Sequence, residues 1–147
     1  MEEVVQAGCG VVPKRSRLWA ALSRVRGWFE AGLTHDDFLQ KLHSEWNEKL
    51  EHDWSHAISN SMVVLGALLW GEGDFRASVG LSIQSMFQTG SNAASVGSII
   101  GAWRGEDALP NDYVLPQGDT LSTGILHQSS VGFVELADRT CRLISQP

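Results

Sequence analysis

The sequence predicts an all-α protein that folds as one domain over residues 1–147. Apolar residues recur at helical spacing in several segments, and residues that commonly begin helices stand directly before three of them. No stretch of useful length alternates between apolar and polar residues, as a half-buried strand would. An apolar fraction of 43% and a charged fraction of 19% are typical of globular proteins, so the chain can bury a hydrophobic core.

Two helices are predicted in the first third of the chain. Ser16 is suited to cap the first and Gly32 to end it. Its apolar face carries Leu18, Leu22, Val25 and Phe29. Thr34 begins the second, and Asp37 three residues later completes a variant of the capping box. The predicted buried stripe of this helix consists of Phe38, Leu42 and Trp46.

A central helix is predicted from His56 to Trp70. It is apolar nearly all round, which is typical of a helix in the middle of a bundle. The Gly71–Gly73 turn stops it, and Asp74 is a good N-cap for the next helix. That helix is expected to carry Val79, Ile83 and Phe87. A further helix from Ser91 to Trp103 is rich in Ala, Gly and Ser, so a neighbouring backbone can approach it closely.

The rest of the chain is predicted to be less regular. Prolines and glycines interrupt the region from Gly105 to Gln128, and a last helix is expected from Val131 to Ile144. The apolar side of that helix carries Phe133, Leu136, Ala137, Thr140 and Leu143.

Charge and composition exclude several classes of protein. The net charge is −6, whereas proteins that bind nucleic acid need basic residues to neutralise phosphates, so we expect no nucleic-acid partner. The longest apolar stretch, Met62 to Trp70, is too short to cross a bilayer, and the acidic N-terminus does not resemble a secretory signal. Cys9 and Cys141 fit neither a zinc site nor a disulfide framework. We therefore expect a cytoplasmic protein without membrane contact.

Two longer segments carry a resemblance to a known family. Leu68-Leu-Trp-Gly-Glu-Gly-Asp-Phe75 and Asn92-Ala-Ala-Ser-Val-Gly-Ser-Ile-Ile-Gly-Ala102 are similar to ADP-ribosylglycohydrolases, in which a Gly-Asp-Phe turn leads toward a metal-binding signature. Shorter pieces agree in the family's order: Ala7-Gly8, Pro13 to Leu18, His56 to Asn60, Ala108 to Pro110 and Glu135 to Thr140. The resemblance implies an orthogonal helical bundle that corresponds to the C-terminal half of the family fold.

The chain departs from the family pattern in two ways. The family domain is much longer, and we expect its N-terminal half, with a Thr-Asp-Asp metal motif, to be missing here. The family signature reads Gly-Phe-Asp-Thr-Asp-Cys-Asn-Gly-Ala-Thr-Val-Gly-Ser-Ile. Aligned on Phe87, Thr89 and Gly97, it places Gln88 and Gly90 where the two aspartates belong.

The second departure bears on chemistry. The resemblance implies a pair of Mg²⁺ ions that hold ADP-ribose and activate water, and Mg²⁺ requires several anionic oxygen ligands. Gln88 offers one neutral oxygen and Gly90 offers no side chain. We therefore predict that the family Mg²⁺ site is lost, that the chain holds no metal or cofactor, and that it has no catalytic residues. The residues expected to remain of the ligand pocket are His56, Asn60, Gln88, Thr89, Ser91 and Asn92.

One spacing suggests a different metal site. Glu48, His52 and His56 are four residues apart, so on one helix they would share a face and could bind a transition metal. A helix boundary is expected at Asp53 and Trp54, and it would break that face. A transition-metal site, a remnant pocket at His56 and ordinary structural roles stay open, and the last is the favoured interpretation.

Three functions are compatible with the sequence. The first is a pseudoenzyme that acts as an interaction or scaffold protein, as a homodimer. The second is a binding module for ADP-ribose or a related nucleotide. The third is a hydrolase of N- or O-glycosidic ADP-ribose linkages that another chain completes. A homodimer is expected because half a domain would leave the central helix uncovered. The alternative is a compact monomer in which the chain's own N-terminal helices pack over it. The aromatic residues expected near its interface are Trp19, Phe29, Phe38 and Trp46.

Overall fold

The structure is a computed structural model that describes residues 1–144. It divides into two compact units, Met1–Ala108 (unit 1) and Leu109–Pro147 (unit 2). Helices dominate both, and the described residues contain a single small sheet of two strands. The predicted all-α class is therefore confirmed. The correspondence with the C-terminal half of the family fold and the single domain over 1–147 stay predictions.

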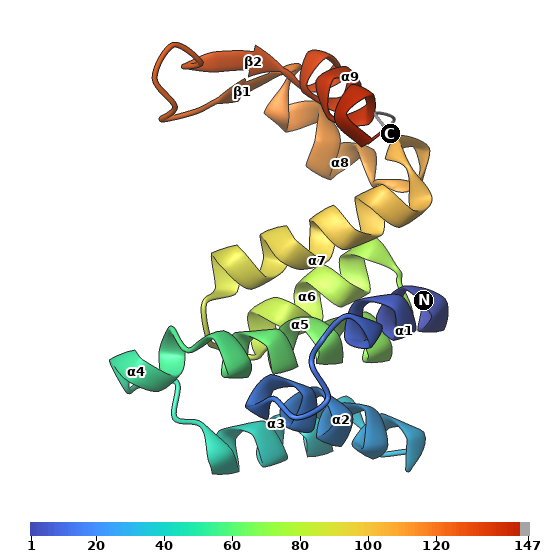
Figure 1. Cartoon of the computed structure of the whole chain (residues 1–147), viewed down its shortest axis with the longest axis vertical. Coiled ribbons are helices and arrows are strands. Elements are labelled where there is room, and N and C mark those ends of the chain that lie inside the picture. Colours follow the sequence, from blue (N-terminus) through green and yellow to red (C-terminus); the bar gives the residue numbers. More distant parts are fainter. Residues whose placement is uncertain (145–147) are drawn as a thin grey trace. The chain divides into compact units, whose positions relative to one another are not determined.

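Unit 1 consists of helices that surround one central helix (Figure 1). In chain order these are α1 (Glu2–Gly10), α2 (Arg17–Glu30), α3 (His35–Glu45), α4 (Glu51–Trp54), α5 (Ala57–Trp70), α6 (Phe75–Gln84), α7 (Thr89–Arg104) and the 3₁₀ turn η1 (Glu106–Ala108). Helices α2 and α3 pack on one side of α5, and α6 and α7 pack on the other. The predicted central position of α5 is confirmed.

Helix α5 supplies six of the sixteen buried apolar residues of unit 1, more than any other helix. Its buried residues are Ser59, Met62, Val63, Leu65, Gly66, Ala67, Leu68 and Leu69. They meet a core that includes Val25, Phe38, Val96 and Ile100, each at most 1% exposed. Burial of this apolar area is the main force that holds the helices together. The chain's own helices therefore cover the central helix, as the alternative to a dimer interface requires.

An aromatic cluster fixes α2 and α3 on α5. The Phe38 ring stacks on Trp70 with centroids 5.0 Å apart, and the Phe29 and Trp70 rings form a T-shaped pair with centroids 5.3 Å apart. The Trp70 indole Nε1 donates a hydrogen bond of 2.8 Å to the Leu33 carbonyl between the two helices. Two of the aromatic residues expected at a dimer interface, Phe29 and Phe38, therefore pack within the chain.

The predicted helix starts are confirmed by their capping bonds. The side chains of Ser16 and Asp74 accept from Trp19 N and Ala77 N, and Thr34 and Asp37 form a complete capping box. The predicted helix over Val79 to Phe87 is too long, because α6 ends at Gln84. Met86 then adopts a left-handed φ of 67° that interrupts the helical path.

Unit 2 contains α8 (Asn111–Val114), η2 (Leu115–Gln117), the strands β1 (Thr120–Ser122) and β2 (Ser130–Gly132), and α9 (Phe133–Ile144). The strands pair antiparallel, with Leu121 opposite Val131. No pattern in the sequence predicted this hairpin, and β1 lies in the segment from Gly105 to Gln128 that was expected to be irregular. The predicted last helix is confirmed as α9, which begins at Phe133, two residues later than expected, because β2 ends at Gly132. Val131 is the one buried side chain among the described residues of this unit.

Within the described residues, none of the helices combines the length and the hydrophobicity that crossing a bilayer requires.

Candidate ligand-binding cavity

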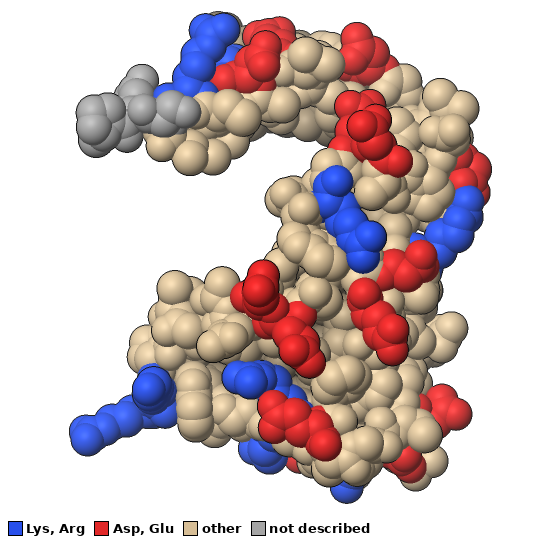
Figure 2. All heavy atoms as spheres, turned by 90° about the vertical axis from the view of Figure 1, so that its right-hand side faces the viewer, with Lys and Arg blue, Asp and Glu red and all other residues tan. Residues whose placement is uncertain are grey.

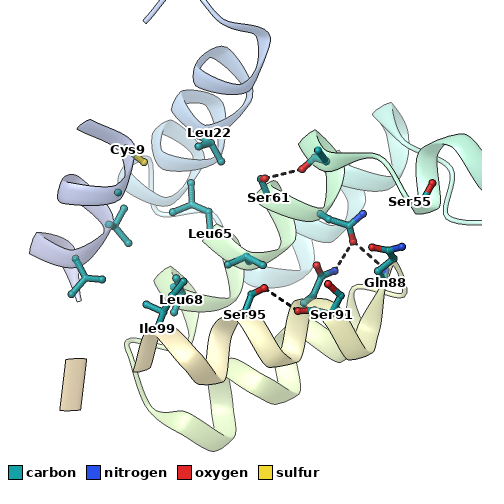
Figure 3. Close-up of a pocket in the computed structure, with 17 residues that line it drawn as sticks. Cys9, Leu22, Ser55, Ser61, Leu65, Leu68, Gln88, Ser91, Ser95 and Ile99 are labelled. Carbon is teal, nitrogen blue, oxygen red and sulfur yellow. Dashed lines mark hydrogen bonds between the residues drawn. The ribbon is translucent and has the colours of Figure 1, made fainter. Parts of the chain in front are cut away.

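A cavity of about 640 Å³ opens between α1, α5 and α7 in unit 1 (Figure 3). Its size is within the usual range for small-molecule sites. One end is polar, and α5, α7 and the turns before them supply its side chains. These are Ser55, Asn60, Ser61, Gln88, Ser91, Asn92 and Ser95. The other end is apolar, where α1 and α2 approach α5.

Asn60 organises the polar end. Its Oδ1 accepts from the Gln88 backbone N–H at 3.1 Å and from Asn92 Nδ2 at 2.8 Å. Its own Nδ2 donates to the carbonyls of Trp54 and His56, both at 2.9 Å. All the hydrogen-bonding groups of this side chain are therefore used within the protein. Asn60 lines the cavity, but it holds the start of α7 against the start of α5 rather than offering a free group.

The signature segment (residues 86–99) passes along this end of the cavity. Phe87 is 1% exposed and anchors the segment, while the backbone at Met86 is strained. Gln88 is the N-cap of α7, yet its side chain makes no capping bond, so its amide is available to a ligand. Gly90 lies at the exposed start of α7 and faces open space.

The apolar end was missed by sequence reasoning because α1 was not predicted. This end is lined by Val4, Val5 and Cys9 of α1 together with Leu65 and Leu68 of α5. Helix α1 contains two glycines and buries a single residue, Val5, so its sequence carries little of the signal that marks a helix. The pattern Val4, Val5, Gly8, Cys9 does have the spacing of one helical face.

Of the six predicted pocket residues, four line this cavity: Asn60, Gln88, Ser91 and Asn92. His56 and Thr89 are not among its lining residues. His56 instead caps α5, where its Nδ1 accepts from Ile58 N at 3.1 Å, and its ring packs against Trp46 with centroids 4.8 Å apart. Thr89 is the exposed first residue of α7.

The alternative triad of Glu48, His52 and His56 does not assemble. Glu48 pairs with His43 at 2.9 Å and His52 pairs with Asp53 at 2.8 Å, although the His52 and His56 rings lie 5.0 Å apart. A helix boundary falls between Trp54 and His56, as expected. Among the described residues, no three potential His, Cys, Asp or Glu ligands converge on one point.

Two carboxylates near this boundary are held in their charged form. Hydrogen bonds from its own backbone and from His43 lower the pKa of Glu48. Hydrogen bonds from the Asn47 backbone and from His52 lower the pKa of Asp53. Both carboxylates are committed to turns of the chain and lie away from the cavity wall.

Comparison with known proteins adds one finding. A family model described as ADP-ribosylglycohydrolase matches residues 1–145. The chain belongs to the ADP-ribosylglycohydrolase family. No curated protein and no solved structure gives a match.

The family resemblance implies bound Mg²⁺, so the ligand atoms that the signature segment offers decide whether this chain can bind it. Where the family resemblance places two aspartates, this member has an amide at Gln88 and no side chain at Gly90. The residues that line the cavity include no Asp or Glu. A neutral amide and a few hydroxyls do not meet the need of Mg²⁺ for anionic ligands. The residues present therefore do not fit a magnesium pair.

Proposed function

We propose that this protein is a non-catalytic member of the ADP-ribosylglycohydrolase family that binds a small ligand in the cavity between α1, α5 and α7. The observation that carries the proposal is the pair Gln88 and Gly90 at the start of α7. Without carboxylates at these positions there is neither a metal cage nor a general base to activate water.

The cavity supports binding in the absence of catalysis. It brings four of the predicted pocket residues to one polar wall, and it places an apolar wall opposite. Such a combination of hydrophobic lining and a few placed polar groups is typical of ligand sites. ADP-ribose or a related nucleotide is the ligand that the family resemblance favours.

Calorimetric titration with ADP-ribose, with and without Mg²⁺, tests this proposal, together with an assay for ADP-ribose release from modified arginine or serine. We expect binding that does not depend on Mg²⁺ and no release above background. Mg²⁺-dependent turnover by the purified chain would overturn the proposal. It would instead show a hydrolase that needs no other chain to supply carboxylates.

A pair of variants on α7 locates the binding site. Ser95 lines the cavity and is exposed, so the change Ser95→Trp should fill the cavity without disturbing the core. Ser98 is an exposed residue of the same helix that does not line the cavity, so Ser98→Trp is the matched control. Binding should be lost in the first variant and kept in the second. Equal affinity in both variants would show that the ligand does not bind in this cavity.

A second candidate is an interaction or scaffold role as a homodimer, and apolar side chains exposed in unit 2 favour it. Those exposed by more than 70% are Leu115, Leu126, Leu143 and Ile144. Soluble proteins rarely leave large apolar patches uncovered. Light scattering at micromolar concentration should give a dimer mass, and Leu143→Ser with Ile144→Ser should lower it to that of the monomer. A monomer mass for the unchanged chain would contradict this role.

We also propose a cytoplasmic location and a partner that is not nucleic acid. On the face shown in Figure 2, basic and acidic side chains are interspersed rather than gathered in one basic tract. Phosphate backbones are bound by concentrated positive charge, and a net charge of −6 opposes their approach.

A further inference from the structure

We propose that the cavity selects a neutral ligand that joins hydroxyl groups to an apolar ring, as in a nucleoside, and that a phosphate on this ligand weakens binding. This inference rests on the proposed function, because it names the ligand class of the same cavity. Three properties of the wall support it: its charge, the direction of its hydrogen bonds, and the position of its apolar end.

The wall carries no charge to balance an anion. None of the 17 residues that line the cavity is a Lys, Arg or His. The positive end of α7 is equivalent to roughly half an elementary charge, which is small beside the two negative charges of a phosphate monoester. The Gln88 N–H at that end is already used by Asn60. A phosphate in the cavity would therefore lose its hydration without gaining a counter-charge.

The polar wall mainly accepts hydrogen bonds. The hydroxyls of Ser55, Ser61 and Ser95 donate to the carbonyls of Glu51, Ala57 and Ser91, at 2.8, 2.7 and 3.0 Å. Each hydroxyl has one proton, so what remains at these oxygens is acceptor capacity. Because a phosphate ester offers only acceptors at neutral pH, whereas ligand hydroxyls can donate, this wall favours hydroxyls.

The two asparagines at the centre of the wall add to this bias. Asn92 donates to Asn60 through Nδ2, which leaves its Oδ1 as a further acceptor. Asn60 adds no donor, since both hydrogens of its Nδ2 are used. Gln88 supplies the remaining amide and Ser91 the remaining hydroxyl, and both groups can donate as well as accept.

The opposite end is shaped for an apolar group. This end is lined by Val5 and Cys9 on α1, by Leu65 and Leu68 on α5, and by Ile99 on α7. Burial of an aromatic ring there would supply most of the affinity, because apolar area removed from water is the main source of binding energy for neutral ligands. A ligand with hydroxyls at one end and a ring at the other matches the cavity in both respects.

Adenosine and AMP test the inference, because they differ by one phosphate. Calorimetry should show adenosine binding at least about tenfold more tightly than AMP, and also more tightly than ADP-ribose. Equal or tighter binding of AMP would overturn the inference. ADP-ribose binding more tightly than adenosine would also overturn it but leave the proposed function standing. If none of the three binds, both proposals fail.

The rate of alkylation of Cys9 tests where in the cavity the ligand binds. Cys9 lies in the cavity wall and Cys141 is exposed in unit 2, so the second thiol is an internal control. Saturating adenosine should slow the reaction of Cys9 with iodoacetamide and leave that of Cys141 unchanged, as followed by mass spectrometry. Protection should disappear in Ser95→Trp and persist in Ser98→Trp. Binding of adenosine without protection of Cys9 would contradict the assignment of its ring to the apolar end.

Discussion

Asn60 in α5 and Asn92 in α7 are joined by a direct side-chain hydrogen bond of 2.8 Å. The same oxygen of Asn60 holds the Gln88 N–H. Asn60→Ala leaves these donors without their partner and frees two carbonyls near the start of α5. We expect it to lower the free energy of unfolding by about 1–3 kcal/mol, since unsatisfied buried polar groups are costly. Urea denaturation measures the change.

Ser61→Ala is the control for this effect. Ser61 is the next residue of α5, and its hydroxyl bonds only to the preceding turn of its own helix. Its removal should change stability by less than about 0.5 kcal/mol. If Asn60→Ala is no more destabilising than Ser61→Ala, Asn60 does not organise this part of the fold.

His35 makes stability depend on pH. Burial against Phe38 and Trp70 lowers its pKa, and the nearby Asp36 offsets only part of this shift. The folded state therefore binds the proton less readily than the unfolded state. Stability is full above the unfolded pKa of about 6.5 and falls as the pH drops toward the lower folded value. Thermal melting between pH 7.5 and 5 should show this loss.

Substitution of His35 distinguishes its contribution to the pH dependence of stability from that of the other histidines. In His35→Leu the loss of stability between pH 7.5 and 5 should be smaller than in the unchanged protein, because the buried imidazole is gone. His52→Gln, at a histidine whose side chain is 76% exposed, should keep the full loss. An unchanged pH profile in His35→Leu would show that another group is responsible.

Gly66 allows α3 to approach α5. A Cβ at this position would lie 2.7 Å from two ring atoms of Phe38, which is itself fully buried between aromatic neighbours. We expect Gly66→Ala to lower the free energy of unfolding by about 1–3 kcal/mol through overpacking. Gly80→Ala in α6 meets no atom within 4 Å and should instead stabilise the protein by about 0.5–1 kcal/mol. The same sign for both would contradict the predicted close packing.

Restoring the two aspartates should not restore the metal site. Gln88→Asp adds one carboxylate to a cavity wall that otherwise holds none, and Gly90→Asp adds a second at the exposed start of α7 beside it. Mg²⁺ is bound well only when several anionic oxygens surround it, so we expect a dissociation constant of about 1 mM or weaker. Calorimetric titration with MgCl₂ measures it, with Ser98→Asp as the control for added charge. Micromolar affinity would show that further ligands are present.

Much of unit 1 could be predicted from the sequence because its signals are local. Ser16, Thr34 and Asp74 bond to backbone groups three residues away, and such caps are visible in the sequence itself. The prediction that the helix after Asp74 extends to Phe87 was wrong, because methionine seldom adopts the left-handed backbone conformation found at Met86. Tertiary packing imposes that conformation when Phe87 enters the core.

The candidate site was predictable only in part, because tertiary packing also determines its arrangement. Asn60 and Asn92 both line one cavity, because each lies in the first turn of a helix that the family resemblance identified, and their role in binding a ligand stays a prediction. That Asn60 is fully bonded within the protein depends on how α5 and α7 meet, and no spacing encodes this. The apolar wall depends on α1, a short helix with two glycines that tertiary contacts hold in place.

The division into two units determines what tryptophan fluorescence can detect. All six tryptophans lie between Trp19 and Trp103, in unit 1, while the single tyrosine, Tyr113, lies in unit 2. Indole emission therefore reports on the first unit alone, whereas far-ultraviolet circular dichroism records the helices of both. The two signals need not change at the same temperature, because unit 2 buries only Val131 among its described residues. A melting curve followed by fluorescence would leave the second unit unobserved.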